Sequence, residues 1–297
     1  MINSAKVSLT SEENRYNSVF RALDYFTQDI VKIIDSIDLN EHRKNYILIK
    51  PNCVVTDVPL AATHPDALRA VLDFLEPIWS GRVILGEGAG IGNTMEAFKN
   101  YGYLDLKKNY PTLEFSDLNY ADAIFIDIFD KHLKAQRIKI ANTVAECPLR
   151  ISVGPPKTHN EVVVTLSIKN MAVGSILKED KENIHQGLKA INRSIATINQ
   201  YTFPHVSVID GWESMEGDGP SSGQKLNTHF AVVSNNPLAA DCFVTELMGF
   251  NPLQIGYLNL LGAQNVLSNI EVLGKDPISF KFHFKPHHSY LEQIQWE

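Results

Sequence analysis

Short, almost wholly apolar segments alternate with segments of helical periodicity along most of this chain. The apolar segments are bounded by turn residues and lie at 46–49, 83–85, 123–128, 149–153, 206–209 and 230–234. Helical spacing marks 17–37, 65–78, 185–200 and 237–248, and a further helix opens at Asn93 or Thr94. Continuous apolar runs are typical of strands covered on both faces. The pattern predicts an α/β fold with a largely parallel or mixed sheet and helices on both faces.

Composition narrows the class of protein. The 297 residues are 44% hydrophobic and 21% charged, and no repeat or long linker divides them, which predicts one domain over 1–297, either undivided or with two lobes around a cleft. No apolar run approaches the roughly 20 residues of a membrane span, and the first residues do not resemble a secretory signal. We therefore expect a soluble, cytoplasmic protein. The net charge of −7 disfavours nucleic acid and anionic membranes as partners.

The three cysteines are isolated in the sequence. Cys53, Cys147 and Cys242 form no Cys-x-x-Cys pair, so we expect free thiols and no iron–sulfur cluster. Cys53 would be nucleophilic if Lys50 lowered its pKa, but a lone thiol is more often inert packing.

Polar turns follow the first two predicted strands of the 46–94 region. Ligands of open α/β sheets bind outside the carboxyl ends of the strands, where these turns fall. Lys50 and Asn52 leave one strand, and Glu87 and Gly88 begin a glycine-rich turn whose backbone N–H groups could approach an anion. The glycines of that turn lack the spacing of a dinucleotide or Walker fingerprint. We expect a ligand cleft here, although each turn taken alone is equally consistent with an ordinary tight connection.

The segment after 149–153 contains the residues best suited to supply positive charge and to transfer protons. Lys157 and His159 lie in a Gly-Pro-Pro turn, and if 162–170 is extended, Lys169 lies on its polar face. Burial can bring a lysine pKa towards neutrality, where histidine also titrates. These three residues are therefore candidates for acid/base catalysis, whereas each alone would be an ordinary solvated or structural side chain.

The segment 210–223 carries four carboxylates and four glycines after an apolar strand. Such crowded negative charge needs a cation, a basic side chain or a polar ligand to offset it, unless the segment is a solvated loop. The candidate ligands for a divalent metal ion are Asp210, Glu213, Glu216 and Asp218, and their spacing does not match the twelve-residue calcium loop. Near the end of the chain, 280–284 is interpreted as an edge strand, and Pro286, His287 and His288 as a surface tail rather than a metal site.

Several of these segments, in this order, resemble one known family. They are Lys50-Pro51-Asn52, Thr63-His64-Pro65, Gly86-Glu87-Gly88, Pro156-Lys157-Thr158-His159, Ser167-Ile168-Lys169-Asn170, Asp210-Gly211, Met215-Glu216-Gly217-Asp218-Gly219-Pro220 and Asp241 before Met248-Gly249. The set is similar to the domain of unknown function 362 family over about residues 46–250. The resemblance implies a shared site and no particular reaction. It adds His64, Asn170, Gly217 and Gly219 to the expected ligand-binding residues. Some relatives carry a ferredoxin-like module with cysteine clusters, which this chain lacks.

The sequence is consistent with three hypotheses about function. The preferred hypothesis is an enzyme that acts on a small polar, anionic substrate by acid/base chemistry, with or without a divalent metal ion. Lys157, His159, Lys169 and Asp210 would be catalytic, and Lys50, Asn52, Glu87 and Gly88 would help to bind the ligand. The alternatives are a non-catalytic ligand- or metal-binding protein, and a redox subunit that receives electrons from a separate ferredoxin-like partner. The sequence identifies neither the cofactor, the substrate nor the oligomeric state.

Overall fold

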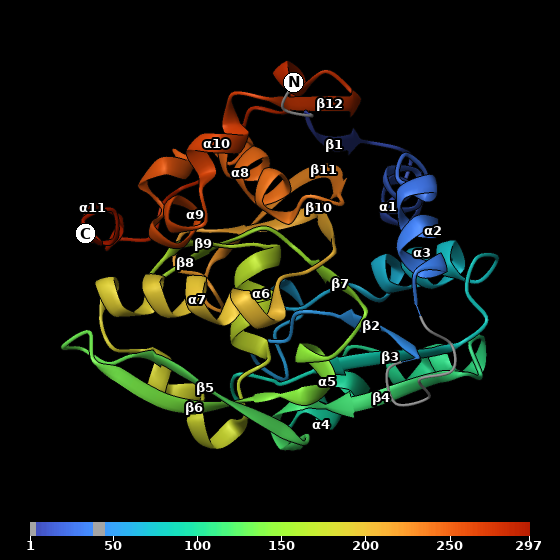
Figure 1. Cartoon of the computed structure of the whole chain (residues 1–297). Coiled ribbons are helices and arrows are strands. Elements are labelled where there is room, and N and C mark those ends of the chain that lie inside the picture. The colour runs from blue at the N-terminus through green and yellow to red at the C-terminus, as the bar shows by residue number, and fades with distance from the viewer. Residues whose placement is uncertain (1–3, 38–44) are drawn as a thin grey trace.

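Most strands join one large sheet. The computed structural model describes residues 4–37 and 45–297. Eight of the ten strands follow one another in the order β12 (Ile270–Gly274), β1 (Ala5–Thr10), β11 (Gln224–Ser234), β10 (Val206–Glu216), β7 (Leu149–Gly154), β2 (Tyr46–Lys50), β3 (Arg82–Glu87) and β4 (Leu113–Asp117) (Figure 1). The other two, β8 (Lys157–His159) and β9 (Val163–Thr165), branch from β10.

The strands β10, β7, β2, β3 and β4 all run parallel to one another. On the other side of β10, β11 runs antiparallel to both β10 and β1, and β12 runs parallel to β1. The carboxyl ends of the parallel strands therefore meet at one edge, where Lys50 and Glu87 are the last residues of neighbouring strands. The predicted α/β fold with a largely parallel or mixed sheet is confirmed.

Alternate residues of the central strands enter different apolar clusters, two of them large and a smaller third one that contains Leu48, Ile84 and Cys147. In β10, Val206 and Val208 belong to one cluster and Ile209 to the other, as the period of two in a strand requires. The first cluster is covered by α1 (Arg15–Asp24), α2 (Thr27–Asp35), α3 (Pro65–Leu75) and α4 (Thr94–Asn100). The second is covered by α6 (Ser167–Gly174), α7 (Leu188–Thr202), α8 (Pro237–Leu247), α9 (Gly256–Leu260) and α10 (Ala263–Leu267). Helices thus cover both faces of the sheet (Figure 1).

The predicted strand at 123–128 lies outside the large sheet. β5 (Ala123–Phe129) pairs with β6 (Ala135–Ala141) as a two-stranded antiparallel ribbon, and α5 (Asn142–Ala145) follows. Ile126 and Ile128 are buried, whereas Phe125, the residue before Ile126 in β5, is 62% exposed. One face of this strand meets the core and the other meets solvent. The expectation of burial on both faces is therefore wrong for this segment.

Two further predicted elements take a different form. The helix expected at 17–37 is divided into α1 and α2, and the Thr27 hydroxyl donates to the Asp24 carbonyl at the break. No strand forms at 280–284, because Phe282 and Phe284 donate their backbone N–H groups to the carbonyls of Leu247 and Met248 at the end of α8. Residues 289–297 then contain the short helix α11 (Tyr290–Gln293).

The two segments with the richest polar chemistry also differ from expectation. Only Val163–Thr165 of 162–170 is a strand, and α6 begins at Ser167, so Lys169 lies on a helix. The acidic segment does not leave its strand at Asp210, because β10 continues through a bulge to Glu216 and pairs with β11. Among the described residues, no helix combines the length and the apolar character that crossing a membrane requires.

A carboxylate from a distant helix holds the start of α6. Asp241 on α8 is fully buried and accepts hydrogen bonds from the backbone N–H groups of Ser167, at 3.1 Å, and Ile168, at 2.9 Å. These are donors of the first helical turn that would otherwise lack partners, because α6 has no side-chain cap of its own. Burial raises the pKa of Asp241 to about 8, while both N–H groups oppose the rise. Asp241 therefore fixes the helix that carries Lys169 and Asn170.

Replacing Asp241 by asparagine is expected to lower the free energy of unfolding by about 1–3 kcal/mol, because the amide can accept only one of the two N–H bonds and leaves a buried donor unpaired. Urea unfolding would measure the loss. The matched control is Asp105→Asn, whose carboxylate pairs with Lys108 at the surface. Equal stability of the two variants would contradict the capping role.

Candidate functional site

A cavity of about 440 Å³ opens at the carboxyl ends of β2 and β3. Its walls come from the loops after these strands, from β9, from α6, from the 3-10 helix η4 (Lys178–Ile184) and from residues 220–221. The predicted site residues that line it are Asn52, Glu87, Gly88, His159, Lys169 and Asn170. The fold thus places polar segments from distant parts of the chain around one space, where the sequence predicted a cleft. We call it the lysine cavity.

A buried ion pair joins the ends of β2 and β3. Lys50 Nζ lies 3.0 Å and 2.9 Å from the two carboxylate oxygens of Glu87, and both side chains are within 2% of full burial. Glu87 also accepts from the backbone N–H groups of Cys53, at 3.1 Å, and Gly88, at 2.8 Å. Burial raises the pKa of Glu87, while Lys50 opposes that rise. Gly174 leaves room for the pair, because a Cβ there would lie 2.2 Å from Lys50 Nζ.

Two amides extend this pair into a network. Asn170 Oδ1 accepts from Lys50 Nζ, at 2.9 Å, and from Asn52 Nδ2, at 3.0 Å. Asn52 Oδ1 in turn accepts from Lys157 Nζ, which also donates to the Ala61 carbonyl at 2.8 Å. Burial, and then the nearby Lys169, lower the pKa of Lys157 to about 7. Five of the predicted residues therefore form one continuous hydrogen-bonded cluster.

Three polar side chains of the lysine cavity keep unused hydrogen-bonding capacity. Lys169 is 7% exposed and forms no hydrogen bond or ion pair with any residue that the structure describes. Burial lowers its pKa to about 8. The Thr165 hydroxyl is buried in the cavity wall and has no hydrogen-bond partner in the described part of the chain. His159 Nδ1 accepts the Glu161 N–H at 3.0 Å, so its neutral ring carries a proton on Nε2 and offers a donor. Burial holds the pKa of His159 well below its usual value.

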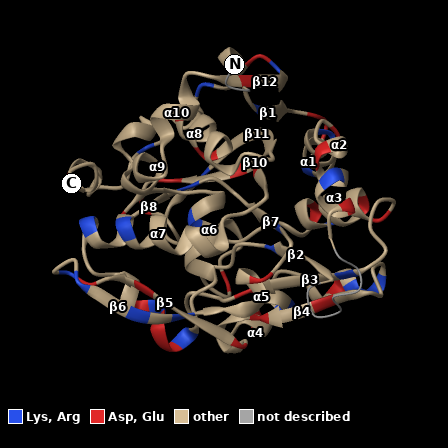
Figure 2. Cartoon of the chain, in the orientation of Figure 1, with Lys and Arg blue, Asp and Glu red and all other residues tan. Residues whose placement is uncertain are grey.

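Positive charge exceeds negative charge around the lysine cavity. Lys181 on η4 donates to the Gly88 carbonyl at 2.6 Å, and burial lowers its pKa to about 8. Lys178 donates to the Gly90 carbonyl at 3.1 Å. Figure 2 shows charges of both signs on the outer helices and on the β5–β6 ribbon, whereas α6, within the molecule, carries a basic segment. The cavity is therefore a cationic site in a chain whose net charge is −7.

Asp210 and His64 lie in a second cavity of about 380 Å³. The Asp210 carboxylate is 2.9 Å from Arg15 Nε, and Glu213 is 2.9 Å from Arg15 Nη2 and 3.0 Å from Lys225 Nζ. His64 Nδ1 caps α3 by accepting the Asp66 N–H at 3.1 Å. Burial raises the pKa of Asp210 to about 6, against the effect of Arg15. Basic side chains thus offset these two acids, and Asp210 does not join His159 and Lys169.

The other predicted residues of the acidic segment hold the backbone in place. Glu216 accepts the Lys285 N–H at 2.8 Å, and the Gly217 carbonyl accepts the Thr158 hydroxyl at 2.9 Å. Gly217 has a φ of +75°, and a Cβ on Gly219 would lie 2.1 Å from the Thr158 carbonyl oxygen. Neither glycine lines the lysine cavity. The four carboxylates therefore do not meet at one position, and Asp218 lies instead beside His287 and His288.

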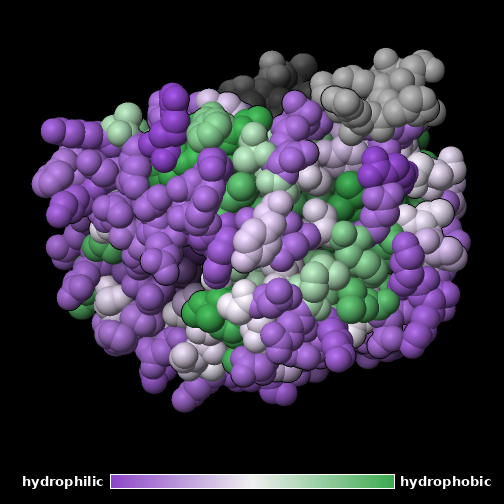
Figure 3. Space-filling view, turned by 90° about the horizontal axis from the view of Figure 1, so that it is seen from below, coloured by the Kyte–Doolittle hydropathy of each residue, from purple (hydrophilic) through white to green (hydrophobic). Residues whose placement is uncertain are grey.

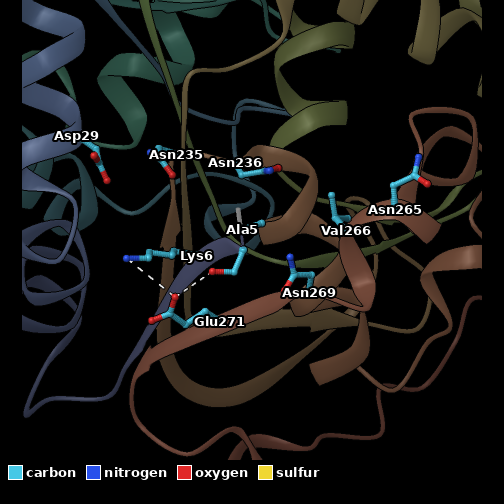
Figure 4. Close-up of a pocket in the computed structure, with 10 residues that line it drawn as sticks. Ala5, Lys6, Asp29, Asn235, Asn236, Asn265, Val266, Asn269 and Glu271 are labelled. Atoms are coloured by element: carbon cyan, nitrogen blue, oxygen red, sulfur yellow. Dashed lines mark hydrogen bonds and ion pairs between the residues drawn. The ribbon is translucent and has the colours of Figure 1, made fainter. Parts of the chain in front are cut away.

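A wider hollow than the lysine cavity lies at the opposite end of the strands. It has a volume of about 910 Å³ and borders the first residue of β1 and the residue before β12 (Figure 4). Its Lys6 is paired with Glu271 at 4.0 Å, and asparagines form much of the wall. Seen from below, another part of the surface is hollowed among mostly hydrophilic residues, with apolar residues gathered beside it (Figure 3). The lysine cavity is the better candidate site because its charged groups are buried and one of them is unpaired.

Several residues of these cavities were missed from the sequence. Lys181 lies in a run of mixed charges that resembles a solvated turn, and Arg15 lies outside every polar motif. The three cysteines are buried and free, and each belongs to a different apolar cluster. Cys53 lines the lysine cavity, but burial raises the pKa of its thiol, which remains protonated and poorly nucleophilic.

The fold has a counterpart among solved structures. The lactate racemase apoprotein from Thermoanaerobacterium thermosaccharolyticum matches with a TM-score of 0.50 and 15% identity over 80% of this chain and 55% of that chain. A structural-genomics protein from Thermotoga maritima matches with a TM-score of 0.45 and 11% identity over 85% and 60% of the two chains. The first likeness concerns the α/β fold alone.

Residues 47–246 match the family described as domain of unknown function (DUF362), and the chain belongs to this family. The resemblance found from the motifs is confirmed. The thylakoid-associated protein sll1697 from Synechocystis sp. is 24% identical over 217 residues, which make up 70% of this chain and 64% of the relative. The chain therefore spans less than two thirds of that relative's length.

Replacing Glu87 by glutamine is expected to lower the free energy of unfolding by about 3–5 kcal/mol, because it leaves the buried Lys50 ammonium without a counter-charge. Urea unfolding would measure the effect. The control is Glu114→Gln, which breaks the exposed ion pair with Arg82 and should cost less than about 1 kcal/mol. A Glu87→Gln protein as stable as the control would contradict the importance of the buried pair.

Proposed function

We propose that the protein binds a small anionic substrate in the lysine cavity and transfers a proton to or from it, as an acid/base enzyme. The observation that carries the proposal is the ammonium of Lys169, a residue only 7% exposed, which lines the cavity and pairs with no described residue. Leaving a buried charge unpaired is costly, so a site that retains one is expected to receive the opposite charge from a ligand.

The charge balance supports an anion. Lys50, Lys157, Lys169 and Lys181 are buried around this space, and Glu87 is the buried carboxylate that lies among them. Two less buried acids lie nearby: Glu182 in the cavity wall and Glu161, which attracts Lys169 but is paired with His185. Lys50 forms an ion pair with the Glu87 carboxylate, so the remaining lysines donate to neutral acceptors or to none. A carboxylate or phosphate group would satisfy these donors, and the low polarity of a buried site would strengthen the attraction.

The remaining groups favour proton transfer over covalent catalysis. In the free protein the pKa of Lys169 is lowered to about 8. A bound anion would raise it, so most of the complex carries the ammonium, and the smaller neutral fraction acts as the general base. His159 Nε2–H and the Thr165 hydroxyl can donate hydrogen bonds to negative charge that develops on the substrate. A carbon acid next to a carboxylate is the substrate class that uses both functions. The proposal assigns no role to Asp210, which pairs with Arg15 elsewhere.

The proposal predicts proton exchange that depends on Lys169. The wild-type protein would be incubated in D₂O with a panel of small mono- and dicarboxylates. It is expected to exchange the carbon-bound hydrogen of at least one of them for deuterium, and proton NMR would monitor the exchange. Lys169→Met should reduce that exchange by at least about 100-fold, because loss of a general base costs about 10²–10⁴ in rate.

The control for charge is Lys189→Met, which removes an exposed lysine from α7, outside the cavity. It should exchange at the wild-type rate. Calorimetric titration with the same compounds and with inorganic phosphate separates binding from catalysis. Saturable binding without exchange would identify a non-catalytic ligand-binding protein, and an unchanged affinity in Lys169→Met would reject the lysine cavity as the site.

Anion binding is expected to weaken as the pH rises. In the free protein the pKa values of Lys157 and Lys169 are lowered to about 7 and about 8, and a bound anion would raise both. The complex therefore holds more protons, so affinity is fully present below about pH 7 and falls as the pH passes 8. Titration calorimetry at pH 8 in buffers of different ionisation enthalpy should reveal proton uptake. Proton release, or an affinity that rises with pH, would contradict this assignment.

A further inference from the structure

One group of metal-binding side chains lies outside the lysine cavity. Asp218 follows β10, and His287 and His288 lie in the segment after Phe284. One ligand atom from each of the three residues lies within 4.8 Å of the other two, and no other group of three such side chains is found among the described residues. We propose that Asp218, His287 and His288 bind a divalent transition-metal ion of the Zn²⁺ type at the mouth of the lysine cavity.

The distances fit one ion. Asp218 Oδ1 lies 3.2 Å from His288 Nδ1 and 3.8 Å from His287 Nε2. A tetrahedral ion with ligands at about 2.1 Å separates them from one another by about 3.4 Å, so small side-chain rotations bring all three atoms into coordination. The Asp218 and His288 side chains are 62% and 79% exposed, which leaves the remaining position open to water. Two imidazoles and one carboxylate favour zinc or a similar transition metal over Mg²⁺ or Ca²⁺.

The backbone around the three side chains is already fixed. The Gly217 N–H donates to the Lys285 carbonyl at 2.7 Å, and the Lys285 N–H donates to Glu216 at 2.8 Å, so the two ligand-bearing segments are joined one to three residues from the ligands. His287 Nδ1 accepts the Ser289 N–H at 3.2 Å and lies 2.8 Å from the Ser289 hydroxyl, and these contacts leave Nε2 facing Asp218. Metal binding at Nε2 requires the tautomer with its proton on Nδ1, which would then donate to the Ser289 hydroxyl, as the second nitrogen of a metal-bound histidine usually donates to a neighbouring acceptor.

The proposed ion lies at the border of the lysine cavity. Pro220 and Ser221, which follow Asp218 closely in the chain, line the cavity, and so does Asn160. The Ser289 hydroxyl donates to the Asn160 carbonyl at 3.2 Å. Binding of the ion would therefore tie the segment after Phe284 to the cavity wall. This inference does not depend on the proposed catalysis, because it requires only the three side chains.

The test uses the full chain without an affinity tag, stripped of metal by a chelator. Titration with Zn²⁺ should show one saturable site per chain by calorimetry, and Co²⁺ in its place should give the visible absorption of a tetrahedral or five-coordinate ion. His288→Gln and Asp218→Asn are each expected to weaken Zn²⁺ binding at least about tenfold, the lower limit for losing even an indirect partner of a metal ligand. All three proteins should keep the same circular dichroism spectrum.

Two histidine variants complete the experiment. His132→Gln removes an exposed histidine outside the cluster and should bind Zn²⁺ as the wild type does. His185→Gln removes a histidine that pairs with Glu161 at the cavity rim, 2.5 Å from it, and should also leave Zn²⁺ binding unchanged. The proposal fails if the wild type shows no saturable site, if His288→Gln and Asp218→Asn retain wild-type affinity, or if His185→Gln alone abolishes binding.

Discussion

The buried ion pair between Lys50 and Glu87 is the interaction on which the candidate site depends. Both residues end parallel strands that lie side by side, so the geometry of the sheet itself brings their side chains together. A pair of this kind adds little stability compared with apolar packing, but losing one partner is costly. It therefore fixes where the neighbouring groups lie. Asn170 and the loop after β3 are positioned by direct hydrogen bonds to the pair.

The ion pair also explains why the site remains cationic. Lys50 neutralises the one carboxylate within the network, and the neutral amides of Asn52 and Asn170 pass hydrogen bonds onward without adding negative charge. Lys157 and Lys169 consequently lie in a buried environment that favours their neutral forms, and their pKa values fall. Two properties follow from the same cause: attraction for an anion, and a lysine that can accept a proton near neutral pH.

Much of the fold and part of the site could be predicted from the sequence. Apolar runs followed by polar turns located β2, β3, β7 and the core of β10. The carboxyl-end rule brought Lys50 and Glu87 together, and Glu87 lines the lysine cavity. The rule failed for Asp210, because β10 continues beyond the sheet edge and turns this carboxylate towards Arg15. Lys169 was recognised, but its helix was not, since the bonds that start α6 come from Asp241, more than 70 positions away. Such long-range partners leave no local pattern, and Lys181 was missed for the same reason.

The pairing of β1 with β12 has a consequence for how the molecule is made. These strands lie near opposite ends of the chain yet run side by side in the sheet, and residues that border the lysine cavity contact the segment around Ser289. On a ribosome, β1 must wait until residues 270–274 have emerged before this partner exists. Contacts between residues so distant in sequence slow folding, because the entropy cost of closing the long loop between them comes before the contacts can stabilise the chain. The sheet edge and the cavity mouth are thus completed only after the buried strands that lie between them in the sequence have been synthesised.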